Sequence, residues 1–171
     1  MDEQELKCIL NTDEQVKKHF TGDIYCVDTL PLHLEKGYFY ITNTRKSNHD
    51  FESEAGHWVT ILFYQDGSLF FCNSFGTFPS PQFWLPLLMS NNTGLTYQPY
   101  QLQNYSATSC GMHVLLFSTF FSYDFKPPDI LKYVYQIDNK NTSVSNMDYD
   151  QIARCFLDRF YGEQRGLHFE P

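Results

Sequence analysis

Apolar residues near the start of the chain recur every three or four positions, which is the period of an amphipathic helix. The pattern predicts one helix over residues 2–10 and a second over residues 13–20, the second stopped by Gly22. Their core-facing side chains are expected to be Leu6, Ile9 and Leu10 in the first helix and Val16 and Phe20 in the second. A loop over residues 24–34 is expected to follow.

Runs of β-branched and aromatic residues predict four strands. Residues 37–43 form the first, and residues 59–64 and 68–72 form a hairpin around the turn sequence Asp66-Gly67. Residues 95–102 form the fourth, at an edge of the sheet because Pro99 has no N–H for a ladder hydrogen bond. The polar residues 44–56 are expected to form a surface loop, and residues 91–94 a turn.

The run from Met112 to Phe121 is apolar almost all round, which predicts a helix buried in the core with Cys110 in its first turn. Thr108 or Ser109 can cap its start through a side-chain oxygen. Other helices are predicted at residues 81–89 with a kink or short break at Pro86, at residues 127–137, and from Met147 or Asp148 to about Gly162, with a polar loop at 138–146. The last helix carries an apolar stripe of Ile152, Cys155, Phe156 and Phe160.

Strands and helices in this order predict a single α+β domain over residues 1–171. A small mixed or antiparallel sheet is expected to pack against a central buried helix that begins at Cys110, with the other helices flanking it. A chain of 171 residues is long enough to bury a full core without disulfides or metals.

Three polar residues suggest a thiol-based site. Cys110 falls in the first turn of its helix, where free N–H groups and the helix dipole favour a thiolate, although a cysteine there can also be a small buried hydrophobe. His57 opens one hairpin strand and Asn73 follows the other, so the two are expected to lie nearly opposite each other. Cysteine, histidine and asparagine are a variant of the triad in which the third residue orients the base. His113 is expected to be a buried, hydrogen-bonded histidine outside this set.

The order of these motifs resembles that of the adenovirus-type maturation cysteine proteases, which are related to the proteases of SUMO and other ubiquitin-like proteins. The matching elements are Gly56-His57-Trp58, Asn73-Ser74-Phe75-Gly76 and Gln103 seven positions before Cys110-Gly111. Residues 3–7, 20–25 and 28–31 also resemble the start of those proteases, so the likeness covers about residues 1–121. The short chain is more similar to the forms found in virophages and Polinton-type elements.

The resemblance implies a cysteine endopeptidase that cleaves after glycine-containing motifs in capsid or virion precursor proteins. Cys110 would be the nucleophile, His57 the base, Asn73 its orienting partner and Gln103 the oxyanion donor. Trp58 would cover a narrow channel for the substrate; plain core packing is the alternative for this side chain.

The chain departs from the family pattern at two places. Family members usually carry an acid where this chain has Asn73; Asp66 is an alternative third member, but it lies in the hairpin turn. The adenovirus enzyme is stimulated by a peptide joined to a cysteine between the third triad member and the glutamine, and no cysteine lies between Cys72 and Cys110 here. Covalent activation of that kind is therefore not expected, and a non-covalent peptide activator is left open.

The charge and the cysteine content of the chain limit which substrates, cofactors and partners are expected. The net charge is −8, and residues 47–125 contain no Lys or Arg, which argues against substrates that carry phosphate and against stimulation by DNA. Five irregularly spaced cysteines without a CxxC motif indicate neither a metal site nor a disulfide framework, and no cofactor is expected. The absence of an apolar leader or span predicts an intracellular, reducing location without secretion or a membrane partner. The resemblance implies that this location is a virion or the host cytoplasm or nucleus.

Three other functions remain compatible with the sequence. The chain could process the tails of ubiquitin-like proteins, or act as an acetyltransferase of the same superfamily, which would need cations for acetyl-CoA phosphates. It could also be an inactive peptide-binding module, which the neutral Asn73 favours.

Overall fold

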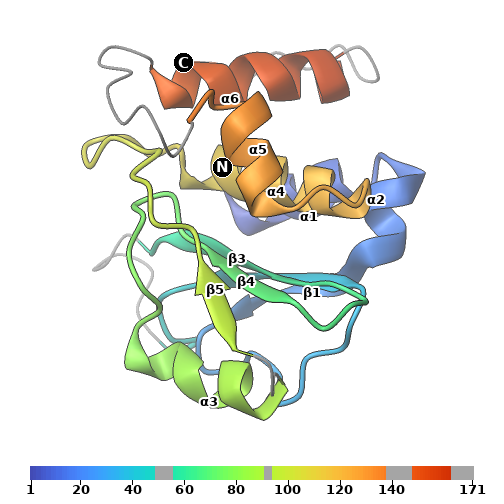
Figure 1. The fold of residues 1–171 in the computed structure, drawn as a ribbon, viewed down its shortest axis with the longest axis vertical. Helices are drawn as coiled ribbons and strands as arrows, with labels where there is room; N and C mark the ends of the chain where they lie inside the picture. The colour runs from blue at the N-terminus through green and yellow to red at the C-terminus, as the bar shows by residue number, and fades with distance from the viewer. Residues whose placement is uncertain (49–55, 91–93, 138–147, 163–171) are drawn as a thin grey trace.

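The computed structural model describes residues 1–48, 56–90, 94–137 and 148–162 of the chain. They form a mixed five-stranded sheet with helices on both faces (Figure 1). The predicted α+β class, with a small sheet packed against a central helix, is confirmed. The predicted loop at 138–146 and most of the turn at 91–94 lie outside the described residues, as do residues 49–55 of the predicted surface loop.

The strands follow the sheet in chain order, with parallel pairs at both edges. They are β1 (Phe20–Cys26), β2 (Tyr38–Asn43), β3 (Trp58–Phe63), β4 (Leu69–Cys72) and β5 (Leu95–Tyr97). The two central pairs, β2 with β3 and β3 with β4, are antiparallel, whereas β1 pairs parallel with β2 and β5 parallel with β4. The predicted hairpin is confirmed, and β5 is an edge strand as expected, although it is shorter than predicted.

Helices cover the sheet unequally. The helices α1 (Glu3–Leu10), α2 (Glu14–His19), α4 (Cys110–Ser122), α5 (Pro127–Tyr133) and α6 (Tyr149–Leu157) gather on one face, and α3 (Pro81–Ser90) covers the other (Figure 1). Alternate residues of the strands therefore enter two cores: Leu62 packs under α4, whereas Ile61 and Phe63 pack toward α3. Because both faces of the sheet are buried, the sequences of its strands are continuous runs of apolar residues.

The central helix α4 is buried as predicted. Every residue of α4 except Phe120 is buried, and the helix packs against β3, where Thr60 Oγ1 lies 3.4 Å from Ser118 Oγ. The residues predicted to face the core from the first two helices are also buried: Leu6, Ile9 and Leu10 in α1, Val16 in α2, and Phe20 at the start of β1.

Several predicted boundaries are wrong. Residues 20–26 form β1 rather than a helix end and a loop; Gly22 does not stop α2 but lies inside β1 with a φ of 88°, where the register with β2 shifts. Helix α3 continues through Pro86 without a break, and α5 ends at Tyr133. The buried face of the last helical segment is formed by Ala153, Leu157 and Tyr161, and Cys155 of the predicted stripe is exposed.

Candidate active site

The backbone of His57 is tied to the end of the neighbouring strand β2. The N–H of Thr44 donates to the His57 carbonyl oxygen over 2.9 Å, and the N–H of His57 donates to Thr44 Oγ1 over 3.2 Å. Gly56 packs against the side chain of Asn43, and a Cβ at Gly56 would lie only 2.0 Å from Asn43 Oδ1. The main chain is therefore fixed at the point where the imidazole leaves the sheet.

The partner of the His57 ring defines its tautomer. Nε2 of His57 lies 2.8 Å from Asn73 Oδ1, which also accepts the N–H of Phe75 over 3.0 Å. The amide nitrogen of Asn73 donates to Thr77 Oγ1 over 2.7 Å, so the amide oxygen faces the imidazole. An amide oxygen can only accept, and Nε2 must therefore carry the proton. Nδ1 keeps its lone pair and is the nitrogen available to a thiol.

Phe75 covers one face of this imidazole. The two ring centroids are 4.3 Å apart with planes inclined by 20°, and Tyr105 stacks on Phe75 with centroids 5.3 Å apart. Burial lowers the pKa of His57; the hydrogen bond to Asn73 opposes this effect, and the nearby His113 adds to it. The ring is thus held as a neutral base. Phe75 was part of the motif that sequence reasoning singled out, but its contact with His57 was not foreseen.

Cys110 is the first residue of α4. Its side chain is 9% exposed, and the first hydrogen bond of the helix runs from Met112 N–H to the Ser109 carbonyl oxygen over 2.9 Å. The N–H groups of Cys110 and Gly111 thus belong to the open first turn, where an anion is favoured. Ser109 occupies the cap position, but its side chain makes no cap hydrogen bond, contrary to the prediction; its hydroxyl donates to Asp150 instead.

Met1 connects the elements that carry His57 and Cys110. The indole N–H of Trp58 donates to the Met1 carbonyl oxygen over 3.3 Å. The Met1 side chain lies against Gly111, where a Cβ would be 3.1 Å from the Met1 sulfur. The residues that follow His57 and Cys110 therefore meet on the same short segment. Trp58 is half-buried and packs against the larger core cluster; its expected role as a cover for substrate remains a prediction.

Gln103 is buried beside Asn73 and held in one orientation. Its Oε1 accepts from Ser74 Oγ over 2.7 Å, and its Nε2 donates to the Ala107 carbonyl oxygen over 2.6 Å. Its backbone N–H donates to the Ser74 carbonyl oxygen over 3.0 Å, which joins the residue after Asn73 to this segment. An amide nitrogen has two hydrogens, so one N–H of Gln103 is left without an acceptor among the described residues.

The other candidates lie apart from this group. Asp66, the alternative third member, lies in the hairpin turn and accepts from Lys126 and from Ser68; these hydrogen bonds lower the pKa of its carboxyl group. Cys72 is buried, and burial raises the pKa of its thiol, so it is unreactive. All five cysteines are free thiols.

His113 is buried as predicted, but its partners were not foreseen. It is 1% exposed, with Nδ1 2.7 Å from the Tyr135 hydroxyl and Nε2 2.8 Å from Asp150 Oδ1. Asp150 was missed because an acid in the first turn of a helix is an ordinary complement to the helix dipole. No local signal links it to residues about 40 positions earlier.

Within the described ranges, no cluster of three or more His, Cys, Asp or Glu side chains is arranged to hold a metal ion. None of the helices described is long and apolar enough to cross a bilayer. The sequence matches no protein-family model, and a comparison with curated proteins also gives no match.

Proposed function

We propose that this protein is a cysteine endopeptidase with Cys110 as nucleophile and His57 as general base. The observation that carries the proposal is the hydrogen bond between His57 Nε2 and Asn73 Oδ1, which leaves the Nδ1 lone pair of a neutral imidazole free to accept a proton. Helix α4, which begins with Cys110, packs against β3, which begins directly after His57. A base oriented by a third residue, beside a thiol, is what nucleophilic catalysis by cysteine requires.

In the first step, Cys110 Sγ forms a bond with the peptide carbonyl carbon while the thiol proton moves to His57 Nδ1. The carbonyl oxygen becomes an oxyanion, for which the free N–H of Gln103 and the backbone N–H of Cys110 are the proposed donors. The C–N bond then breaks, and His57 returns the proton to the leaving amine. Water, deprotonated by His57, hydrolyses the thioester and regenerates the thiol.

The proposed substrates are polypeptides cut after glycine, in capsid or virion precursor proteins. This specificity rests on the likeness of the Gly56-His57-Trp58, Asn73–Gly76 and Gln103–Gly111 motifs to the adenovirus-type proteases. The lack of Lys and Arg over residues 47–125 supports an uncharged peptide rather than acetyl-CoA, whose phosphates need cations.

Cleavage is expected to depend strongly on glycine immediately before the cut. The resemblance implies that Trp58 and the backbone beside His57 form a channel with room for a small residue only, so a peptide library should show a kcat/KM at least roughly 10-fold higher for Gly than for Leu or Phe. Competition mass spectrometry of the cleaved library measures these ratios. Equal rates for Gly and Leu would refute the glycine specificity while leaving the cysteine mechanism in place.

The orienting role of Asn73 predicts opposite effects for two substitutions. Asn73→Ala removes the acceptor that holds the imidazole and should lower kcat about 10-fold or more, since general-base catalysis contributes roughly 10²–10⁴. Asn73→Asp keeps the acceptor and adds an anion, so activity should be kept or increased and the pKa of His57 should rise.

The pH dependence of kcat/KM separates these two effects. Burial lowers the pKa of His57, so the wild-type protein should keep its neutral base and its activity to below about pH 6.5, the ordinary pKa of histidine. In Asn73→Asp this acid limb should move to higher pH, because a neighbouring carboxylate favours imidazolium. Wild-type kinetics in Asn73→Ala would mean that another residue orients His57.

A further inference from the structure

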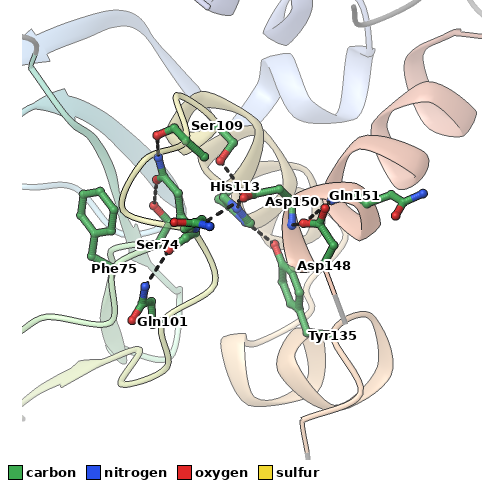
Figure 2. A network of polar contacts seen from close by, with 12 residues as sticks. Ser74, Phe75, Gln101, Ser109, His113, Tyr135, Asp148, Asp150 and Gln151 are labelled. Carbon is green, nitrogen blue, oxygen red and sulfur yellow. Dashed lines mark hydrogen bonds and ion pairs between the residues drawn. The ribbon is translucent and has the colours of Figure 1, made fainter. Parts of the chain in front are cut away.

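The carboxylate of Asp150, in the first turn of α6, reaches across to the segment that leads into α4 (Figure 2). Its Oδ1 accepts from the hydroxyl of Ser109 and from His113 Nε2, the latter over 2.8 Å. Its Oδ2 accepts the backbone N–H of Asn104 over 3.4 Å. One side chain from a distant part of the sequence thus makes three contacts around the candidate site.

These contacts hold both ends of one short segment. Asn104 directly follows Gln103, and Ser109 directly precedes Cys110. The six residues 104–109 therefore separate the proposed oxyanion donor from the nucleophile, and Asp150 touches the first and the last of them. Within the segment, the Ala107 N–H donates to the Asn104 carbonyl oxygen over 2.9 Å, which closes a turn between the two held ends.

The carboxylate is itself held from behind. Asp148 Oδ1 accepts the N–H groups of Asp150 and Gln151 over 3.1 and 3.3 Å, which fixes the start of α6. His113 is in turn braced by the fully buried Tyr135. Burial alone would raise the pKa of Asp150, but the hydrogen bonds from His113 and Ser109 prevail and lower it, so the group is an anion at neutral pH.

Serine, histidine and aspartate in one cluster do not form a second triad here. In a serine triad the imidazole lies between the hydroxyl and the carboxylate. Here the Ser109 hydroxyl and His113 Nε2 both bond to the same carboxylate oxygen, and His113 Nδ1 bonds to Tyr135. Asp150 instead holds Asn104 and Ser109, the two ends of the segment 104–109, and we call this arrangement the Asp150 clamp.

We propose that Asp150 is a positioning residue that sets the distance between the Gln103 amide and the Cys110 N–H, and so the shape of the oxyanion site. The proposal rests on the proposed function, because an oxyanion site has meaning only for attack on a carbonyl. Such donors act through preorganisation: small displacements weaken their interaction with the developing negative charge. Loss of the clamp should therefore affect reactions that form an oxyanion and spare reactions of the thiol that do not.

The test compares three reactions of Asp150→Ala with those of the wild-type protein. We expect kcat for a glycine-containing peptide to fall at least about 10-fold with KM changed less, and inhibition by a peptide aldehyde ending in glycine to weaken by a similar factor. Both reactions form an oxyanion at the carbonyl carbon. Alkylation of Cys110 by iodoacetamide forms none and should stay within about 2-fold. If Asp150→Ala does not fold, Asp150→Asn replaces it in the test, because this substitution keeps the side-chain volume. It should lower kcat and aldehyde inhibition by a smaller factor and leave the alkylation rate unchanged.

Asp13→Ala is the matched control. Asp13 is also an aspartate at a helix start, where its Oδ1 accepts the N–H groups of Gln15 and Val16 over 2.9 Å. Its Oδ2 accepts from the Tyr123 hydroxyl over 3.0 Å, just past the opposite end of α4. This variant should lose thermal stability as Asp150→Ala does, with kcat and aldehyde inhibition unchanged.

The outcomes separate the two levels of the proposal. A wild-type protein that neither cleaves peptides nor binds the aldehyde overturns the proposed function and the clamp with it. If the wild-type protein is active but Asp150→Ala and Asp150→Asn both have the same kcat as the wild-type protein, the positioning role of Asp150 is wrong and the proposed function stands. Equal losses in Asp13→Ala, or a loss of alkylation that parallels the loss of hydrolysis, would also overturn it.

Discussion

Replacement of Cys110 by alanine is expected to abolish peptide cleavage, with kcat falling by about 10⁴-fold or more. The sulfur supplies the only bond that the proposed mechanism makes to substrate, and neither His57 nor Gln103 can replace it. The change from thiol to methyl is small at this 9% exposed position, so the free energy of unfolding should change by no more than about 1 kcal/mol. Hydrolysis assays and thermal unfolding measure the two quantities.

Cys155→Ala is the matched control for this variant, because Cys155 is exposed on α6 and makes no part of the candidate site. It should retain wild-type cleavage. Retained cleavage in Cys110→Ala would remove Cys110 from the mechanism. Loss of cooperative unfolding in Cys110→Ala would instead show that the side chain is chiefly structural.

Gln103→Ala is expected to lower kcat by roughly 10²–10³-fold, with a smaller change in KM. In the proposed mechanism the second N–H of Gln103 donates to the charge that develops in the transition state, and a donor of this kind acts more on the transition state than on bound substrate. The amide also has two structural bonds, to Ser74 and to Ala107, so unfolding must be measured beside the kinetics.

The neighbouring Gln101 provides the comparison for Gln103. Its amide donates to the Gln103 carbonyl oxygen over 3.0 Å, on an exposed side chain outside the site. Gln101→Ala should therefore leave kcat within about 2-fold, as surface substitutions usually do. If Gln103→Ala had a kcat as high as that of Gln101→Ala, the oxyanion role of Gln103 would have to be given up.

The parts of the fold that follow from the sequence are those fixed by local pattern. The apolar run from Cys110 and the paired runs around Asp66-Gly67 each bury nearly all of their side chains, and each was predicted with the right type and approximate bounds. β1 was missed because it is an edge strand whose parallel partner comes later in the chain, and because Thr21, Gly22 and Asp23 carry no strand pattern.

The same division holds for the candidate site. His57 and Asn73 flank one hairpin, so a local argument was enough to place them together, and the structure joins them by a 2.8 Å hydrogen bond. The contacts of Ser109 and His113 with Asp150 cross about 40 residues and depend on how α6 docks on α4. The pattern and spacing of residues in the sequence cannot predict such contacts, because they form only when the helices pack together.

The most direct test of the cysteine endopeptidase assignment is covalent labelling by a peptide vinyl sulfone that ends in glycine, followed by mass spectrometry of the digested protein. We expect one added probe per chain, on Cys110, and no labelling of Cys110→Ala or of protein whose His57 has been replaced by alanine. A protein that stays unlabelled, or that carries the probe on the exposed Cys8 or Cys155 instead, would contradict it.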